Sequence, residues 1–129
     1  MREILFRGKS FSGVINHSWL FGSLDTTEKE CPSIIYIDRF GNRCRVFLDP
    51  KTVGQYTGLT DKNGKKIFEG DILKNIESNE IVAICYGGCS FCYSHNGTIY
   101  GIDDSETGLE MNEWEVIGNI HDNPELLEV

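Results

Sequence analysis

The sequence predicts an all-β protein, and two observations carry the prediction. Short stretches rich in β-branched and aromatic residues follow one another along the chain, separated by groups of Gly, Asn and Asp that favour turns. No stretch of ten or more residues keeps a clean 3.6-residue apolar period, so a long amphipathic helix is not expected. The 129 residues have the length of one ordinary domain.

Eight segments are predicted to be strands, and most of them are five to eight residues long. In chain order they are residues 4–6, 13–21, 34–37, 43–48, 71–76, 81–86, 98–102 and 114–120. Tight turns are expected between several of them, because Gly and Asn accept a positive φ at low cost. These turns are residues 38–42, 61–64 and 95–97.

Alternation within the strands predicts which side chains face the core. In residues 43–48, Cys44 and Val46 are expected to face inward, whereas Arg43 and Arg45 face water. In the last strand, Gly118 marks a position where another part of the backbone approaches closely.

The remaining segments are less regular. Residues 22–33 and 103–112 are polar and rich in helix and strand breakers, so both are expected to be loops. A single helical turn is expected near the C-terminal end, with Asn123 as its N-cap and Pro124 at its first position.

The net charge of −8 argues against a dedicated binder of nucleic acid or of an anionic membrane. The charge is unevenly distributed, however. Residues 1–102 hold 12 Lys and Arg against 11 Asp and Glu, whereas residues 103–129 hold nine Asp and Glu and no Lys or Arg. The exclusion is therefore firm only for the acidic end, and the rest of the chain can hold a local basic face.

Two further features indicate the compartment. No apolar run approaches the roughly 18 residues of a membrane span, and the N-terminal residues are not organised as a signal peptide. We therefore expect a cytoplasmic protein without membrane contact. The five cysteines are odd in number, which favours reduced thiols over a disulfide framework.

The most specific stretch is residues 52–72, TVGQYTGLTDKNGKKIFEGDI. Together with residues 2–8 (REILFRG) and residues 115–127 (EVIGNIHDNPELL), it resembles the YopX family, small proteins encoded mainly by bacteriophages and prophages of Gram-positive bacteria. The resemblance implies a single all-β domain with a barrel related to SH3-like rolls, formed by residues 51–129, and additional N-terminal hairpins in residues 1–50. It also implies the cytoplasm of a bacterial host. It brings no established activity and no catalytic residues.

The central motif also has a direct physical interpretation. Residues 61–65 supply a tight turn, Ile67 and Phe68 supply packing, and residues 69–71 form a second turn before the next strand. The alternative is an exposed binding patch on the same motif, formed by Gln55, Tyr56, Lys62, Lys65 and Lys66.

Three cysteines and a histidine lie close together, at Cys85, Cys89, Cys92 and His95. The CxxxCxxC spacing is that of radical-SAM iron–sulfur enzymes, but such enzymes are longer α/β chains. A zinc site of the same four residues is the stronger metal alternative. We prefer an interpretation without metal or other cofactor, with Cys89 and Cys92 on opposite strand faces and His95 in the following turn.

No catalytic constellation is evident. His17, His95 and His121 are scattered, and neither a GxSxG elbow nor a phosphate-binding loop is present. The acidic residues 103–106 lack the spacing of an EF-hand and are interpreted as a solvated loop. We therefore expect a protein that is not an enzyme.

A protein-interaction role is preferred, with a host or phage protein as partner and self-association through strand edges. Aromatic residues at 19, 21, 91, 93 and 100 are available for such surfaces, although Trp19 and Trp114 are expected in the core. Binding of single-stranded nucleic acid is the alternative. The candidate binding residues are Arg39, Arg43, Arg45, Tyr56, Lys62, Lys65 and Lys66, with Phe40 and Lys51 beside the first three.

Overall fold

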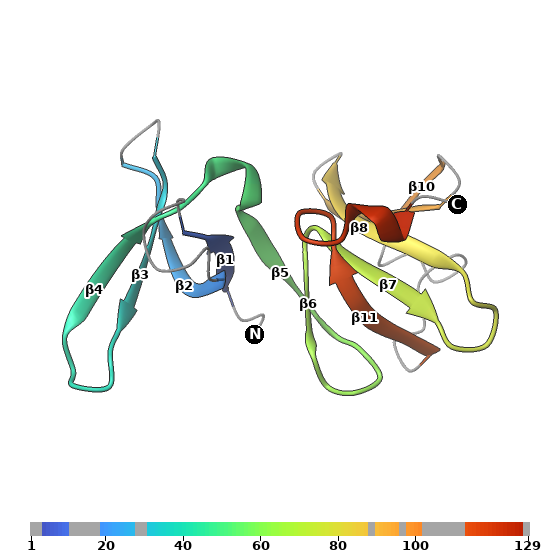
Figure 1. The fold of residues 1–129 in the computed structure, drawn as a ribbon, viewed down its shortest axis with the longest axis horizontal. Helices are drawn as coiled ribbons and strands as arrows, with labels where there is room; N and C mark the ends of the chain where they lie inside the picture. Colours follow the sequence, from blue (N-terminus) through green and yellow to red (C-terminus); the bar gives the residue numbers. More distant parts are fainter. Residues whose placement is uncertain are drawn as a thin grey trace. The chain divides into compact units, whose positions relative to one another are not determined.

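The computed structural model describes residues 4–10, 19–27, 31–87, 90–95, 98–101 and 113–127. These residues form eleven strands and two short 3-10 turns, which confirms the all-β prediction (Figure 1). No helix of the described part is long and apolar enough to cross a membrane. The chain divides into two compact units, Met1–Tyr56 and Thr57–Val129, which we describe separately.

The first unit supplies strands to a six-stranded sheet whose order is β4-β3-β2-β1-β5-β6. Its core face is tightly packed: Ile34 and Leu48 are fully buried, and a Cβ on Gly8 would lie 2.6 Å from Leu48 Cδ1. A short 3-10 turn, η2, follows the fourth strand. The elements are β1 (Phe6–Lys9), β2 (Trp19–Asp25), β3 (Ser33–Ile37), β4 (Arg43–Phe47), η2 (Pro50–Thr52) and β5 (Gly54–Thr60), of which β5 continues into the second unit.

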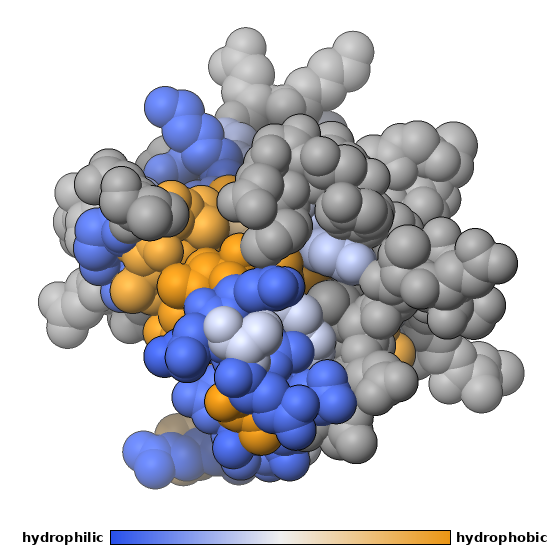
Figure 2. All heavy atoms as spheres, turned by 90° about the vertical axis from the view of Figure 1, so that its right-hand side faces the viewer, coloured by the Kyte–Doolittle hydropathy of each residue, from blue (hydrophilic) through white to orange (hydrophobic). Residues whose placement is uncertain are grey.

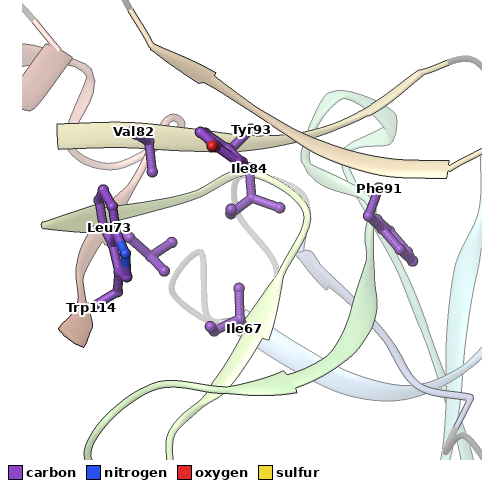
Figure 3. Close-up of a cluster of buried hydrophobic side chains, with 7 residues drawn as sticks. All are labelled: Ile67, Leu73, Val82, Ile84, Phe91, Tyr93 and Trp114. Carbon is purple, nitrogen blue, oxygen red and sulfur yellow. The ribbon is translucent and has the colours of Figure 1, made fainter. Parts of the chain in front are cut away.

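The second unit contains a five-stranded antiparallel sheet in the order β10-β9-β8-β7-β11. Its core is a cluster of seven buried side chains from β6, β7, β8, β9 and β11 (Figure 3), namely Ile67, Leu73, Val82, Ile84, Phe91, Tyr93 and Trp114. The elements are β6 (Lys66–Phe68), β7 (Asp71–Asn75), β8 (Ile81–Gly87), β9 (Ser90–His95), β10 (Thr98–Gly101), β11 (Trp114–Asn119) and the 3-10 turn η4 (Pro124–Leu127).

Several sequence expectations are corrected by strand pairing. Part of the predicted loop 22–33 is strand, because β2 continues to Asp25 and pairs with β3 from Ser33 onward. Three strands, β5, β6 and β9, were not predicted: they contain glycines or polar residues, and hydrogen bonds to neighbouring strands outweigh their weak local preference. The predicted loop at 103–112 lies outside the described residues.

The end of the chain behaves largely as predicted. The predicted helical turn is present as η4. A Cβ on Gly118 would lie 2.6 Å from Asn123 Oδ1, so a close approach does occur, but the approaching group is a side chain rather than backbone. The register of β11 against β7 shifts between Val116 and Gly118, a β-bulge that admits this contact.

Candidate functional site

The central motif forms a turn that is tied to the last strand. Asp61 is 6% exposed, and its Oδ1 accepts the N–H groups of Asn63 and Lys65 at 2.8 and 2.9 Å. Its Oδ2 accepts the N–H of Val116 at 3.0 Å. Burial raises the pKa of the Asp61 carboxyl, but the three hydrogen bonds outweigh burial and the net pKa is lowered. These hydrogen bonds stabilise the turn and link it to β11 within the second unit.

The second turn of the motif is equally structural. Gly70 has a φ of +93°, a conformation that favours glycine, and its N–H donates to the carbonyl of Ile84 at 2.8 Å. Asp71, 2% exposed, accepts the Phe68 N–H at 2.7 Å. The most recognisable residues of the sequence therefore form turns and links between strands.

The sheet of the first unit has one buried face and one face with exposed apolar and charged side chains. Register pairs Arg45 with Ile35 and Arg43 with Ile37 on β4 and β3, and alternation places Phe47 on the same side. We call this side the arginine–aromatic face. It is formed by Lys9, Trp19, Phe21, Ser23, Asp25, Ile35, Ile37, Arg43, Arg45 and Phe47. Arg7 and Ser33 lie on the same side of the sheet but are buried.

Large apolar side chains on this face are open to solvent. Phe21 is 50% exposed, Ile37 is 64% exposed and Phe47 is 44% exposed, although each lies within a regular strand. The opposite face carries the buried Ile34 and Val46, which confirms that Arg43 and Arg45 point outward from β4. Three exposed apolar groups on one sheet face are typical of an interaction surface.

Cations accompany these apolar groups. Arg45 pairs with Asp25 at 2.9 Å, across the intervening strand β3. The guanidinium of Arg7 lies 4.6 Å from the centroid of the Trp19 ring, and Lys9 Nζ lies 5.9 Å from it. Hydrogen bonds from Thr27, and secondarily Arg45, lower the pKa of the Asp25 carboxyl. Trp19 is therefore partly covered by cations rather than buried in the core as expected.

The predicted turn at residues 38–42 joins β3 to β4 beside this face. Asp38 Oδ1 accepts the N–H groups of Phe40 and Asn42 at 2.9 and 2.8 Å, and Gly41 has a φ of +84°. These bonds shape the turn so that Phe40 is 76% exposed, with the Arg39 guanidinium 5.1 Å from its ring centroid. The turn thus adds an arginine and an aromatic ring to the β3–β4 hairpin.

The structure separates the predicted binding residues into two groups. Arg39, Arg43 and Arg45 share the β3–β4 hairpin of the first unit, whereas Lys62, Lys65 and Lys66 belong to the β5–β6 hairpin of the second. Lys62 is paired with Glu115 at 3.6 Å, and Lys65 is exposed. Tyr56 is only 6% exposed and offers little surface to a partner.

Sequence reasoning overlooked two residues of the arginine–aromatic face, Ile37 and Phe47. The alternation that places Arg43 and Arg45 in water applies equally to Phe47, so its signal was present in the sequence. Ile37 could be found only from the pairing of β3 with β4.

The cysteine cluster is described only in part. Cys85 and Cys92 lie opposite each other on β8 and β9, with their Sγ atoms 2.7 Å apart. His95 was expected in the following turn. It belongs instead to β9, because its backbone pairs with Thr98 of β10. Cys89 lies outside the described residues. Among the residues that are described, no group of three or more His, Cys, Asp or Glu side chains is placed to hold a metal ion.

Charge differs sharply between the two units. Residues 1–56 hold eight Lys and Arg against six Asp and Glu, a net charge of +2. Residues 57–129 hold four Lys and Arg against fourteen Asp and Glu, a net charge of −10. The protein's acidity therefore belongs to the second unit, and the arginine–aromatic face lies in the weakly basic one.

Fold and sequence together define a small all-β protein of two units with an exposed sheet face. The chain belongs to the YopX protein family, whose model matches residues 11–128. Among solved structures, it is similar to protein EF1440 from Enterococcus faecalis, with 25% sequence identity and a TM-score of 0.61 over 99% of this chain and 100% of that one. No curated protein matches the sequence.

Proposed function

We propose that this protein is a non-enzymatic interaction module that binds a partner protein through the arginine–aromatic face. One observation carries the proposal: Phe21, Ile37 and Phe47 are exposed on a single face of a regular sheet. Exposed apolar groups in contact with water are unfavourable, and a partner that covers them gains the free energy of their burial.

The charges on the face indicate the chemistry of the partner. Arg43 on the face and Arg39 in the adjoining turn are exposed, and an arginine side chain can hold a carboxylate through two parallel hydrogen bonds. Aromatic and arginine side chains are also the groups most enriched at the centres of protein interfaces. The proposed partner is accordingly a host or phage protein, in the cytoplasm of a bacterial host, that presents an apolar segment flanked by acidic residues.

Single-stranded nucleic acid is the second candidate, favoured by the same face. Arginines and exposed phenylalanines on one antiparallel sheet form a stacking surface with positive charge, which is how many proteins hold unpaired bases and phosphates. The net charge of +2 on the first unit permits this.

The two candidates are separated by a capture experiment with the full chain. Extracts of a bacterial host are passed over the immobilised protein, with and without nuclease treatment. Retention of a protein in both arms supports the proposed function, whereas retention that nuclease abolishes supports the second candidate. Capture of neither argues against both.

A matched pair of variants locates the surface. Arg43→Glu with Phe47→Ser changes the arginine–aromatic face, and we expect at least a tenfold loss of affinity for the captured partner. Lys65→Glu with Ile76→Ser is the control: it makes the same change of charge and replaces one exposed apolar side chain by Ser, but in the second unit. Equal loss in both variants would place the binding surface elsewhere.

A further inference from the structure

The second unit holds two thiols in direct opposition. Cys85 and Cys92 are register partners in the antiparallel pair β8 and β9. The pairs Ile84–Tyr93 and Tyr86–Phe91 lie on either side of them. Opposed residues of an antiparallel pair have Cα atoms about 4.5–5.5 Å apart. This separation lies within the range of about 4.4–6.8 Å between Cα atoms that a disulfide spans.

The sulfur atoms are already in contact. Their separation is 2.7 Å, and either atom can be the hydrogen-bond donor to the other. Burial, followed by the hydrogen bond and charge of Cys92, raises the pKa of Cys85 to about 12. Cys85 is half-buried and Cys92 is 4% exposed, so a reagent from solution reaches Cys85 first.

We propose that Cys85 and Cys92 form a reversible thiol–disulfide site whose oxidant is a low-molecular-weight disulfide. In the first step the Cys85 thiol gives up its proton, and the thiolate attacks one sulfur of the small disulfide, which forms a mixed disulfide and releases a small thiolate that takes up the proton. In the second step the Cys92 sulfur attacks the Cys85 sulfur, releasing the second small thiol. The two protein thiols are thereby oxidised to one disulfide, and the small disulfide is reduced to two thiols that carry the two protons.

Strand geometry favours reversal of this bond. The Ile84 carbonyl accepts the N–H of Gly70, which precedes β7, so the backbone groups of Ile84 face away from β9 and those of Cys85 face toward it. The pair therefore occupies a hydrogen-bonded position of the β8–β9 ladder, where Cβ atoms are farther apart than at the alternate position. A disulfide in such a position is more easily reduced than an unstrained one.

Oxidised glutathione is the probe for a test on purified, reduced protein. Two matched variants are compared: Cys31→Ser, Cys44→Ser and Cys89→Ser together leave the opposed pair, whereas Cys85→Ser, Cys89→Ser and Cys92→Ser together leave two half-buried thiols of the first unit. We expect the first variant to lose two free thiols and the mass of two hydrogen atoms, and to regain both on reduction. The second should gain only the mass of glutathione adducts or stay unchanged.

The unmodified chain provides a second measurement that does not depend on the folding of either variant. Cleavage by an aromatic-specific protease after Tyr86 and Phe91 places Cys85, Cys89 and Cys92 on three different fragments. A fragment pair joined by Cys85 and Cys92, seen only without reductant, supports the proposal. Pairs joined through Cys89, stable glutathione adducts, or no linkage at all would overturn it.

Discussion

Removing the Asp61 carboxylate should destabilise the second unit by about 2–6 kcal/mol. The side chain accepts three backbone N–H groups, two within its own turn and one from Val116. Asn63 and Lys65 are exposed, so their N–H groups regain water when the carboxylate is lost, and each costs about 0.5–1.5 kcal/mol. The Val116 N–H is half-buried and is left without an acceptor, which costs about 1–3 kcal/mol.

The assay is urea unfolding of Asp61→Ala, followed by fluorescence of the buried Trp114 in a background in which Trp19 is replaced by Phe. Asp61→Asn is the informative comparison, because it retains an oxygen for the turn and loses only the acceptor for Val116. We expect it to lose about half as much stability as Asp61→Ala. A loss below about 1 kcal/mol in Asp61→Ala would refute the reasoning, because that is the net worth of a single ordinary hydrogen bond.

The same carboxylate makes stability depend on pH. Its pKa is lowered in the folded chain, so its contribution is complete above the ordinary Asp value of 3.8 and disappears as pH falls through the lowered folded value. Acid titration of the unfolding free energy should therefore be steeper for the unmodified chain than for Asp61→Asn.

Three further predictions concern other contacts. Gly118→Ala should lower the free energy of unfolding in urea by about 1–3 kcal/mol, because the new Cβ would meet Asn123 Oδ1 at 2.6 Å. The loss should be smaller in an Asn123→Ala background, which lacks that atom, and an equal loss in both backgrounds would contradict the predicted contact. Gly70→Ala should cost about 1–2 kcal/mol because its φ is +93°, and a neutral result would show that the turn adopts another conformation. With reductant present, the free energy of unfolding should fall as pH rises from about 9 toward about 12, because the unfolded Cys85 thiol loses its proton before the folded one does. Over the same pH range, the thermal midpoint of Cys85→Ser should fall less than that of the unmodified chain.

The sequence was informative where local chemistry decides the structure. The turns at residues 38–42 and 61–64 were predicted from Gly and Asn residues that accept a positive φ at low cost, and both form. In the structure, Asp38 and Asp61 also accept N–H groups of their own turns. The strand from Arg43 was predicted from β-branched and alternating residues, with its faces assigned correctly. In these places the decisive interactions lie within a few residues of each other.

Features that depend on pairing between distant segments were not predictable in this way. Strand β5 includes two glycines and forms because its neighbours supply hydrogen bonds. The arginine–aromatic face and the opposition of Cys85 and Cys92 both require knowledge of register, since a shift of one residue would move every side chain to the other face. Spacing alone made the cysteines resemble metal ligands.

The link from Asp61 to Val116 also determines when the second unit can be completed during synthesis. The two residues are 55 positions apart, and the carbonyl of Trp114 accepts the N–H of Lys62 beside them. Until β11 has left the ribosome, the charged turn lacks the strand that buries it, and the core lacks Trp114. A nascent chain ending before residue 114 is therefore expected to hold the second unit open and sensitive to protease, and the unit should close in one late step.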